Sequence, residues 1–190
     1  MLAAMALDTK AVKMGSAEDV PAGEFSAAKY GPAQFPKVQS AIEGRAVEAT
    51  MLAAALAKDQ TAAEAKYGVP TPAGPEFSVK FTGKVGKADS GVYDVAVPGM
   101  PDNIHLSVQT GPAINGTDLR DATGLIKFGD FNNQIDYQNA GSALNNEMKK
   151  VVLSKIDVSD LTGKTLSVIG AFEPSDPAEW VITPVKLTVQ

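Results

Sequence analysis

The hydrophobic pattern changes period along the chain, and this change predicts an α+β fold. Up to about residue 68 the apolar residues recur at helical spacing, whereas beyond residue 76 they alternate with polar residues, as in half-buried strands. One helical stretch interrupts the alternating part, which gives the order strand, strand, strand, helix, strand, strand. This order is that of an OB-like, partly open five-stranded β-barrel with one inserted helix, although a plain α+β sandwich shares it. The sequence therefore predicts such a barrel, preceded by an N-terminal helical layer.

Composition and turn residues divide the chain into four segments. Residues 1–6 are interpreted as a signal-peptide remnant, because Ala4-Met5-Ala6 has the small-x-small pattern at which signal peptides are cut. Residues 7–68 are the helical segment, which packs on the barrel. Residues 69–76, rich in proline and glycine, are a linker, and residues 77–190 are the barrel domain.

Two helix boundaries are expected within the helical segment. A short helix should begin after Ser26 as its N-cap and break at Gly31-Pro32, because proline disrupts a helix interior. Apolar residues recur at four-residue steps from Val38, and the last helix should end at Gly68 in a left-handed conformation.

The barrel strands are placed by their alternation. They are expected at residues 77–82, 93–97, 104–108, 166–170 and 180–189, and a further short strand at Ile126 to Phe128. The inserted helix should bury one apolar face, which consists of Ala140, Leu144, Met148 and Val151.

Composition argues against several classes of function. The 190 residues carry a formal charge of −5 and the sequence pI is about 4.9, and an acidic protein repels the phosphate backbone of nucleic acids. The chain has no cysteine and a single histidine, His105, which removes thiolate chemistry and the usual zinc sites. Four aspartates between residues 118 and 136 match no calcium loop. We therefore expect no metal and no cofactor.

The stretch GLIKFGDFNNQIDY, residues 124–137, is the main candidate site. It places three side-chain amides beside Phe128 and Phe131. Amides donate and accept hydrogen bonds, so they suit neutral polyhydroxylated ligands or peptide backbone, and aromatic rings offer an apolar platform. The alternative is that the amides cap the following helix. Nearby, Asp121 beside Arg120 is expected to form an ion pair or a local cap.

Several stretches together resemble a known bacterial family. They are "GPAINGTDLRDATGLIKFGDFNNQIDYQNAGSALNNEMKKVVL", "LTGKTLSVIGAF", "ITPVKLTVQ", and, nearer the N-terminus, "LDTKAVKMGS" and "LAAALAKDQTAAEAKYG". They are similar to domain of unknown function family 2291, whose members are described as predicted periplasmic lipoproteins. The resemblance covers nearly all of residues 7–190. It implies export to the periplasm of a Gram-negative bacterium, no assigned enzymatic activity, and an accessory role beside sugar-type ABC transporters. Because the given chain has no cysteine, membrane association is expected only if a lipid anchor lies upstream.

Three functions remain open at this point. The first is a non-enzymatic periplasmic binding or accessory module that contacts a sugar-type small molecule or a transporter component. Arg120 and Lys127 would meet an anionic group or a partner carboxylate, and alanine at Asn133 or Asp130 would remove binding without affecting folding. The second is a carbohydrate hydrolase that uses paired carboxylates such as Asp121 and Asp130. The third is an oligonucleotide-binding barrel, which the acidic charge disfavours. The expected contact surface of the binding module consists of Arg120, Asp121, Lys127, Phe128, Asp130, Phe131, Asn133 and Gln134.

Overall fold

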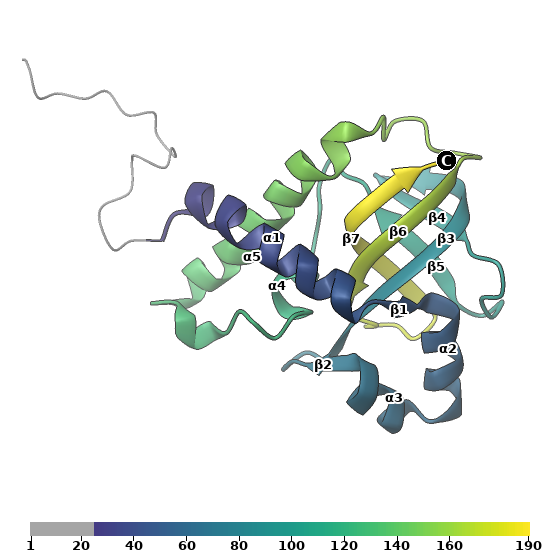
Figure 1. The fold of residues 1–190 in the computed structure, drawn as a ribbon, viewed down its shortest axis with the longest axis horizontal. Coiled ribbons are helices and arrows are strands. Elements are labelled where there is room, and N and C mark those ends of the chain that lie inside the picture. The colour runs from purple at the N-terminus through teal and green to yellow at the C-terminus, as the bar shows by residue number, and fades with distance from the viewer. Residues whose placement is uncertain (1–24) are drawn as a thin grey trace, which may run out of the picture.

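The computed structural model describes residues 25–190, and the predicted signal-peptide remnant at residues 1–6 lies outside them (Figure 1). Helices precede the barrel, and one long helix is inserted into it. The helices are α1 (Ala27–Arg45), α2 (Ala49–Lys58), α3 (Gln60–Tyr67), α4 (Asp118–Asp121) and α5 (Gln134–Val151), with the 3-10 helices η1 (Phe128–Asp130) and η2 (Leu153–Lys155). The strands are β1 (Val47–Glu48), β2 (Gly68–Pro70), β3 (Pro75–Asp89), β4 (Val92–Ala96), β5 (His105–Gln109), β6 (Thr165–Phe172) and β7 (Glu179–Val189).

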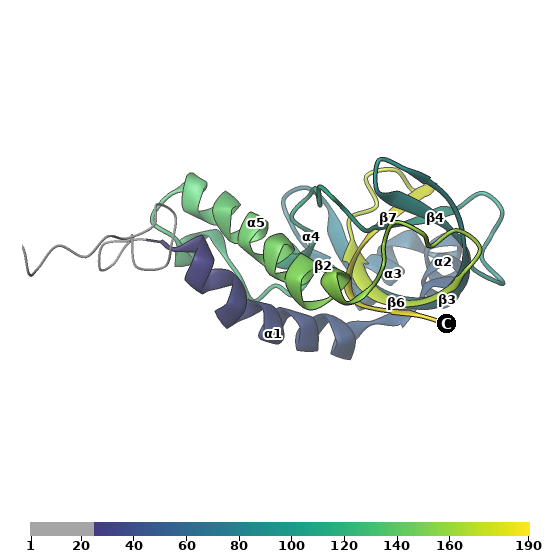
Figure 2. The same cartoon turned by 90° about the horizontal axis from the view of Figure 1, so that it is seen from above.

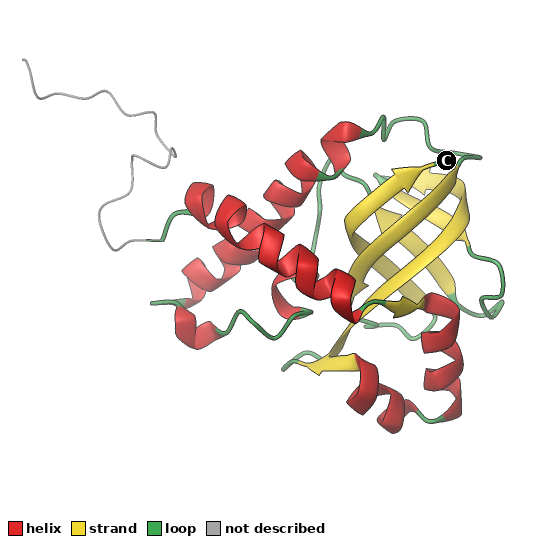
Figure 3. Ribbon diagram, viewed as in Figure 1, coloured by secondary structure: helices red, strands yellow, loops and turns green. Residues whose placement is uncertain are grey.

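Strands β3 to β7 form the predicted barrel (Figure 3). Their pairings run from β3 through β4, β5, β7 and β6 and return to β3. The longest ladder joins β3 to β6 in antiparallel register, from Phe77 opposite Phe172 to Lys84 opposite Thr165. By contrast, β5 and β7 are parallel. The inserted α5 lies between the third and fourth barrel strands, so the OB-like fold class is confirmed.

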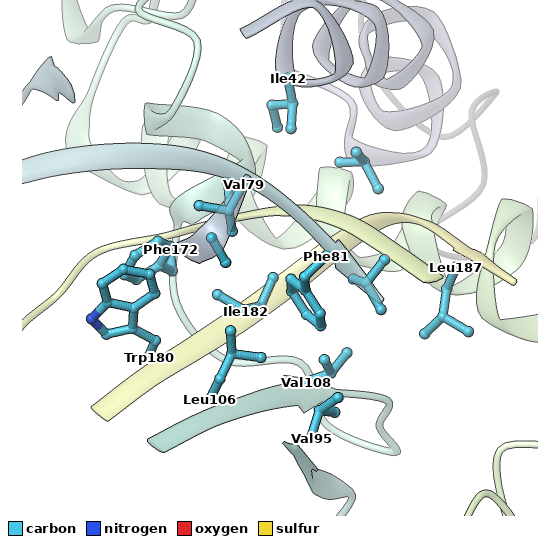
Figure 4. Close-up of a cluster of buried hydrophobic side chains, with 14 of the residues drawn as sticks. Ile42, Val79, Phe81, Val95, Leu106, Val108, Phe172, Trp180, Ile182 and Leu187 are labelled. Atoms are coloured by element: carbon cyan, nitrogen blue, oxygen red, sulfur yellow. The ribbon is translucent and has the colours of Figure 1, made fainter. Parts of the chain in front are cut away.

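The barrel interior is filled by alternate residues of these strands (Figure 4). Phe81 of β3, Val108 of β5 and Ile182 of β7 are among the buried residues of one core cluster. At one end the rings of Phe172 and Trp180 pack with centroids 4.7 Å apart. A fully buried side chain of this size contributes about 1.5–3 kcal/mol, so this interior is a main source of the fold's stability.

Helices α1 and α5 pack side by side and project from the barrel (Figure 2). We call this pair the arm. The predicted break at Gly31-Pro32 is wrong, because α1 continues through both Pro32 and Pro36. A Cβ atom at residue 31 would lie 2.7 Å from the carbonyl oxygen of Ala143 in α5. Glycine therefore lets the two helices approach closely, and this packing holds α1 helical despite its prolines.

The predicted linker at residues 69–76 is a β-hairpin instead. Residues Gly68 to Pro70 pair with Pro75 to Phe77, so β2 extends the sheet beside the start of β3. Gly68 is extended, with φ −83° and ψ 152°, and it does not supply the expected left-handed stop. The backbone of this segment finds strand partners, which its proline content alone did not indicate.

The expected strand at Ile126 to Phe128 is also wrong. Phe128 begins the 3-10 helix η1, and the residues before it have no regular secondary structure. The turn is closed by the backbone N–H of Lys127, which donates to Asp130 Oδ2 at 2.9 Å. Because Leu125 and Phe128 are exposed, their apolar character does not reflect burial in a sheet.

Candidate binding groove

A groove opens between the β2–β3 hairpin, α4 and the beginning of α5. Its volume is about 580 Å³. One wall consists of Val69 to Ala73, and the opposite wall carries five of the eight residues predicted from the sequence. We call it the hairpin groove. Its predicted members are Arg120, Asp121, Lys127, Phe128 and Gln134, and Tyr137 lies in the same wall.

A bidentate ion pair between Arg120 and Asp121 lies at this groove. Arg120 donates from Nε to Asp121 Oδ1 and from Nη2 to Asp121 Oδ2, both at 2.7 Å. Thr117 Oγ1 donates to Asp121 Oδ2 at 2.6 Å, and the hydroxyl of Tyr137 donates to Oδ1 at 3.1 Å. Both carboxylate oxygens of Asp121 therefore already accept two hydrogen bonds each.

Arg120 is also fixed on its other side. Its Nη1 donates to the backbone carbonyl of Tyr137 at 3.1 Å, and its guanidinium carbon lies 3.6 Å from the centroid of the Tyr137 ring. Arg120 and Asp121 thus tie α4 to the first turns of α5. The ion pair expected from the sequence is present, and it lies in the wall of the groove opposite the hairpin.

Asp130 and Asn133 close the loop that leads into α5. Asn133 Oδ1 accepts from the backbone N–H of Asp136, and Asn133 Nδ2 donates to Asp136 Oδ2, both at 2.9 Å. This is the N-cap arrangement that satisfies one of the free N–H groups of a helix start. Of the two interpretations of the amides, helix capping describes Asn133.

A second groove lies on the other side of the 125–131 segment. It has a volume of about 430 Å³, and Asp130 and Phe131 line it together with Phe25 and Tyr30. The rings of Phe25 and Phe131 are 5.8 Å apart, and those of Tyr30 and Phe131 are 5.7 Å apart. The structure therefore divides seven of the eight predicted residues between two grooves, and Asn133 lines neither.

Two carboxyl groups with raised pKa values near the hairpin groove were not predicted as site residues. Glu76 is only 3% exposed. Burial, reinforced by the negative charges of Asp118, Asp121 and Glu173, raises the pKa of Glu76 to about 9. Among residues 25–190 its Oε2 atom has no hydrogen-bond partner. Glu76 is therefore protonated at neutral pH.

Asp118 is the second of these groups. Burial raises the pKa of Asp118 to about 6, while a hydrogen bond from Thr183 acts in the opposite direction. Gln109 Nε2 donates to Thr183 Oγ1 at 2.9 Å, and Thr183 Oγ1 donates to Asp118. These hydrogen bonds connect the end of β5, β7 and α4. Glu76 falls in the linker predicted from the sequence. In the structure it belongs to β3, where it pairs with Val69 and is almost fully enclosed.

The described part of the chain shows neither a metal centre nor a membrane span. Within residues 25–190, no group of three or more His, Asp or Glu side chains could hold a metal ion. No helix in the same range combines the length and apolar character needed to cross a bilayer.

The strand pairings and the inserted helix define an OB-fold protein with an added helical arm. The chain belongs to DUF2291, a family described as a predicted periplasmic lipoprotein, which matches residues 1–188. This confirms the resemblance and the periplasmic location that it implied. In structure the chain is similar to an OB-fold protein from Thermotoga maritima, with a TM-score of 0.69 and 22% sequence identity, covering 88% of this chain and 99% of that chain. That likeness supports the fold alone. No curated protein matches the sequence.

Proposed function

We propose that this protein is a non-enzymatic periplasmic binding or accessory module whose contact surface is the hairpin groove. The supporting observation is that five residues selected from the sequence line a single groove of about 580 Å³. Ligand sites commonly have volumes of about 300–1,000 Å³ and combine apolar walls with a few polar groups. The groove therefore has the size and lining of a small-molecule or peptide site.

The lining favours a neutral, polyhydroxylated ligand such as a sugar. Phe128 and Tyr137 pack edge to face, with centroids 5.7 Å apart, and supply an aromatic wall. Gln134 carries an amide that both donates and accepts, and Lys127 carries a flexible donor. Because Arg120 is held by Asp121 and Tyr137, we assign it to positioning the wall, and Lys127 to donating a hydrogen bond to a hydroxyl group of the ligand. A sugar ligand agrees with the sugar-type ABC uptake that the family resemblance implies.

The hydrolase alternative has less support. Asp121 is held by Arg120, Thr117 and Tyr137, and Asp130 lines the second groove rather than the hairpin groove. A pair of catalytic carboxylates must face one substrate from a shared cleft. The oligonucleotide alternative conflicts with the formal charge of −5.

This proposal is tested by titrating the isotope-labelled protein with a panel of mono- and disaccharides. Binding is detected as changes in the amide NMR chemical shifts. We expect at least one sugar to shift the signals of Lys127, Gln134 and Tyr137. Gln134→Ala should abolish the response. The matched control is Gln60→Ala, because Gln60 is an exposed residue of α3 that bonds only locally to Glu64. A panel with no responding sugar, or one whose shifts survive in Gln134→Ala, would count against the hairpin groove as a sugar site.

A further inference from the structure

Large hydrophobic side chains are exposed in the segment that leads from α4 into α5. Leu125 is 60% exposed, Phe128 is 51% exposed and Ile135 is 68% exposed. All three lie between the end of α4 and the first turn of α5. We call these three residues the tip patch. Because these side chains are exposed, polar residues at the same positions would not weaken the packing of the core. Their apolar character therefore needs another explanation.

The tip patch lies where the described chain enters the fold. Phe25, the first described residue, packs its ring against Tyr30 of α1 at 5.2 Å and against Phe131 at 5.8 Å. Phe131 belongs to the same segment as Leu125 and Phe128. The 24 preceding residues therefore join the fold beside the patch, so a tether attached through them would connect to the described fold at this end (Figures 1 and 2).

The family description and the chemistry of the patch both fit a lipid surface. The family is one of predicted periplasmic lipoproteins, a description that places its members at a membrane surface. Leucine, isoleucine and phenylalanine are side chains that insert into the boundary between headgroups and acyl chains. The neighbouring charges are Lys127, Asp130 and Asp136, which give no net positive charge to attract anionic lipids.

We propose that the tip patch rests on the phospholipid surface when the protein is tethered through its N-terminal segment. The patch then fixes the orientation of the arm, and the hairpin groove, whose wall shares Phe128, opens close to the membrane. Contact is apolar rather than electrostatic, so it should persist when anionic lipid is omitted and when salt is raised. The inference does not depend on the ligand of the groove.

The absence of cysteine from the chain permits a direct test. A single cysteine introduced as Ile135→Cys is labelled with an environment-sensitive fluorophore, and the full chain is tethered by an N-terminal histidine tag to vesicles of phosphatidylethanolamine and phosphatidylglycerol containing a nickel-chelating lipid. We expect a blue shift on tethering, and quenching by spin-labelled lipid. The matched control is Met51→Cys, because Met51 is 46% exposed but lies on α2. Its label should show neither change.

Two further results would overturn the proposal. The first is an unshifted label at residue 135 on tethered protein. The second is a blue shift that appears without vesicles and grows with protein concentration, since this means that a second copy covers the patch. A Leu125→Ser change in the labelled protein should reduce the shift. Because Leu125 does not line the hairpin groove, this variant should leave the sugar titration unchanged, so failure here is distinguishable from failure of the proposed function.

Discussion

At the scale of single residues, the polar side chains in and beside the 124–137 segment divide between two roles. Asp121 and Asn133 are acceptors for the local backbone or for neighbouring side chains, whereas Gln134 and Lys127 line the hairpin groove. A residue that caps a helix cannot be replaced without a cost in stability. Binding studies on this segment therefore need variants that separate the two roles.

Asn133→Ala should destabilise the protein, contrary to the expectation from sequence that it affects binding alone. Loss of the N-cap bond to Asp136 should lower the free energy of unfolding by about 1 kcal/mol. Urea denaturation followed by circular dichroism measures this change. Asn132→Ala is the adjacent control and should change stability by less than about 0.5 kcal/mol. Equal stability of Asn133→Ala and the wild type would show that the cap contributes nothing.

Glu76 predicts an unusual dependence of stability on pH. Its pKa is about 9 in the folded protein and has an ordinary value of 4.5. Below about pH 4.5 both states hold the proton. Between pH 4.5 and 9 only the unfolded state releases it, so the contribution of Glu76 to stability falls as pH rises, by up to about 1.4 kcal/mol per pH unit. Above pH 9 the contribution is constant.

Glu76→Gln should remove this dependence. The variant keeps the shape of the side chain but has no ionisable group, so its stability relative to the wild type should increase from pH 5 to pH 9. Urea denaturation at several pH values measures the difference. Asp118, whose pKa is raised to about 6, should leave a residual slope between about pH 4 and pH 6 in both proteins. A constant difference across the range would contradict the buried, protonated state of Glu76.

At the scale of secondary-structure elements, alternation predicted the strands better than it predicted the arm. Strands β3 and β4 bury alternate residues, so Phe81 and Val95 show the period of two clearly. In α1, the decisive feature is the contact of Gly31 with Ala143 of α5, a long-range contact that no local pattern encodes. The apolar residues before η1 led to the prediction of a strand at Ile126 to Phe128. Leu125 and Phe128 are exposed instead, so their apolar character does not indicate burial in a sheet.

The arm gives a matched pair of glycine substitutions. Gly31→Ala places a Cβ atom 2.7 Å from the Ala143 carbonyl oxygen, whereas a Cβ atom at Gly44 meets nothing within 4 Å. Both residues lie in α1. Gly31→Ala should lower the free energy of unfolding by about 1–3 kcal/mol through overpacking. Gly44→Ala should raise it by about 0.5–1 kcal/mol, because alanine favours the helix. Thermal and urea denaturation of both variants measure these changes, and a stabilising Gly31→Ala would disprove the close helix contact.

At the scale of the whole molecule, the protein is an OB-like barrel whose helical arm carries the candidate surfaces. The sequence indicated the barrel and the importance of the 124–137 segment. It could not show that this segment divides two grooves, because that division depends on α1 and the β2–β3 hairpin lying on its opposite sides. Nor could it distinguish Glu76 from an exposed strand residue, since enclosure depends on what covers the strand.

The most direct test of this account is hydrogen–deuterium exchange of the full chain with and without a sugar that shifts its NMR spectrum. Our account predicts that the ligand slows exchange in residues 69–73 and 124–137, which form the two walls of the hairpin groove. OB-fold proteins commonly bind ligands on the face of their second and third strands, which are β4 and β5 here. Slower exchange confined to β4 and β5, with no change at residues 124–137, would contradict the assignment of the binding site to the groove.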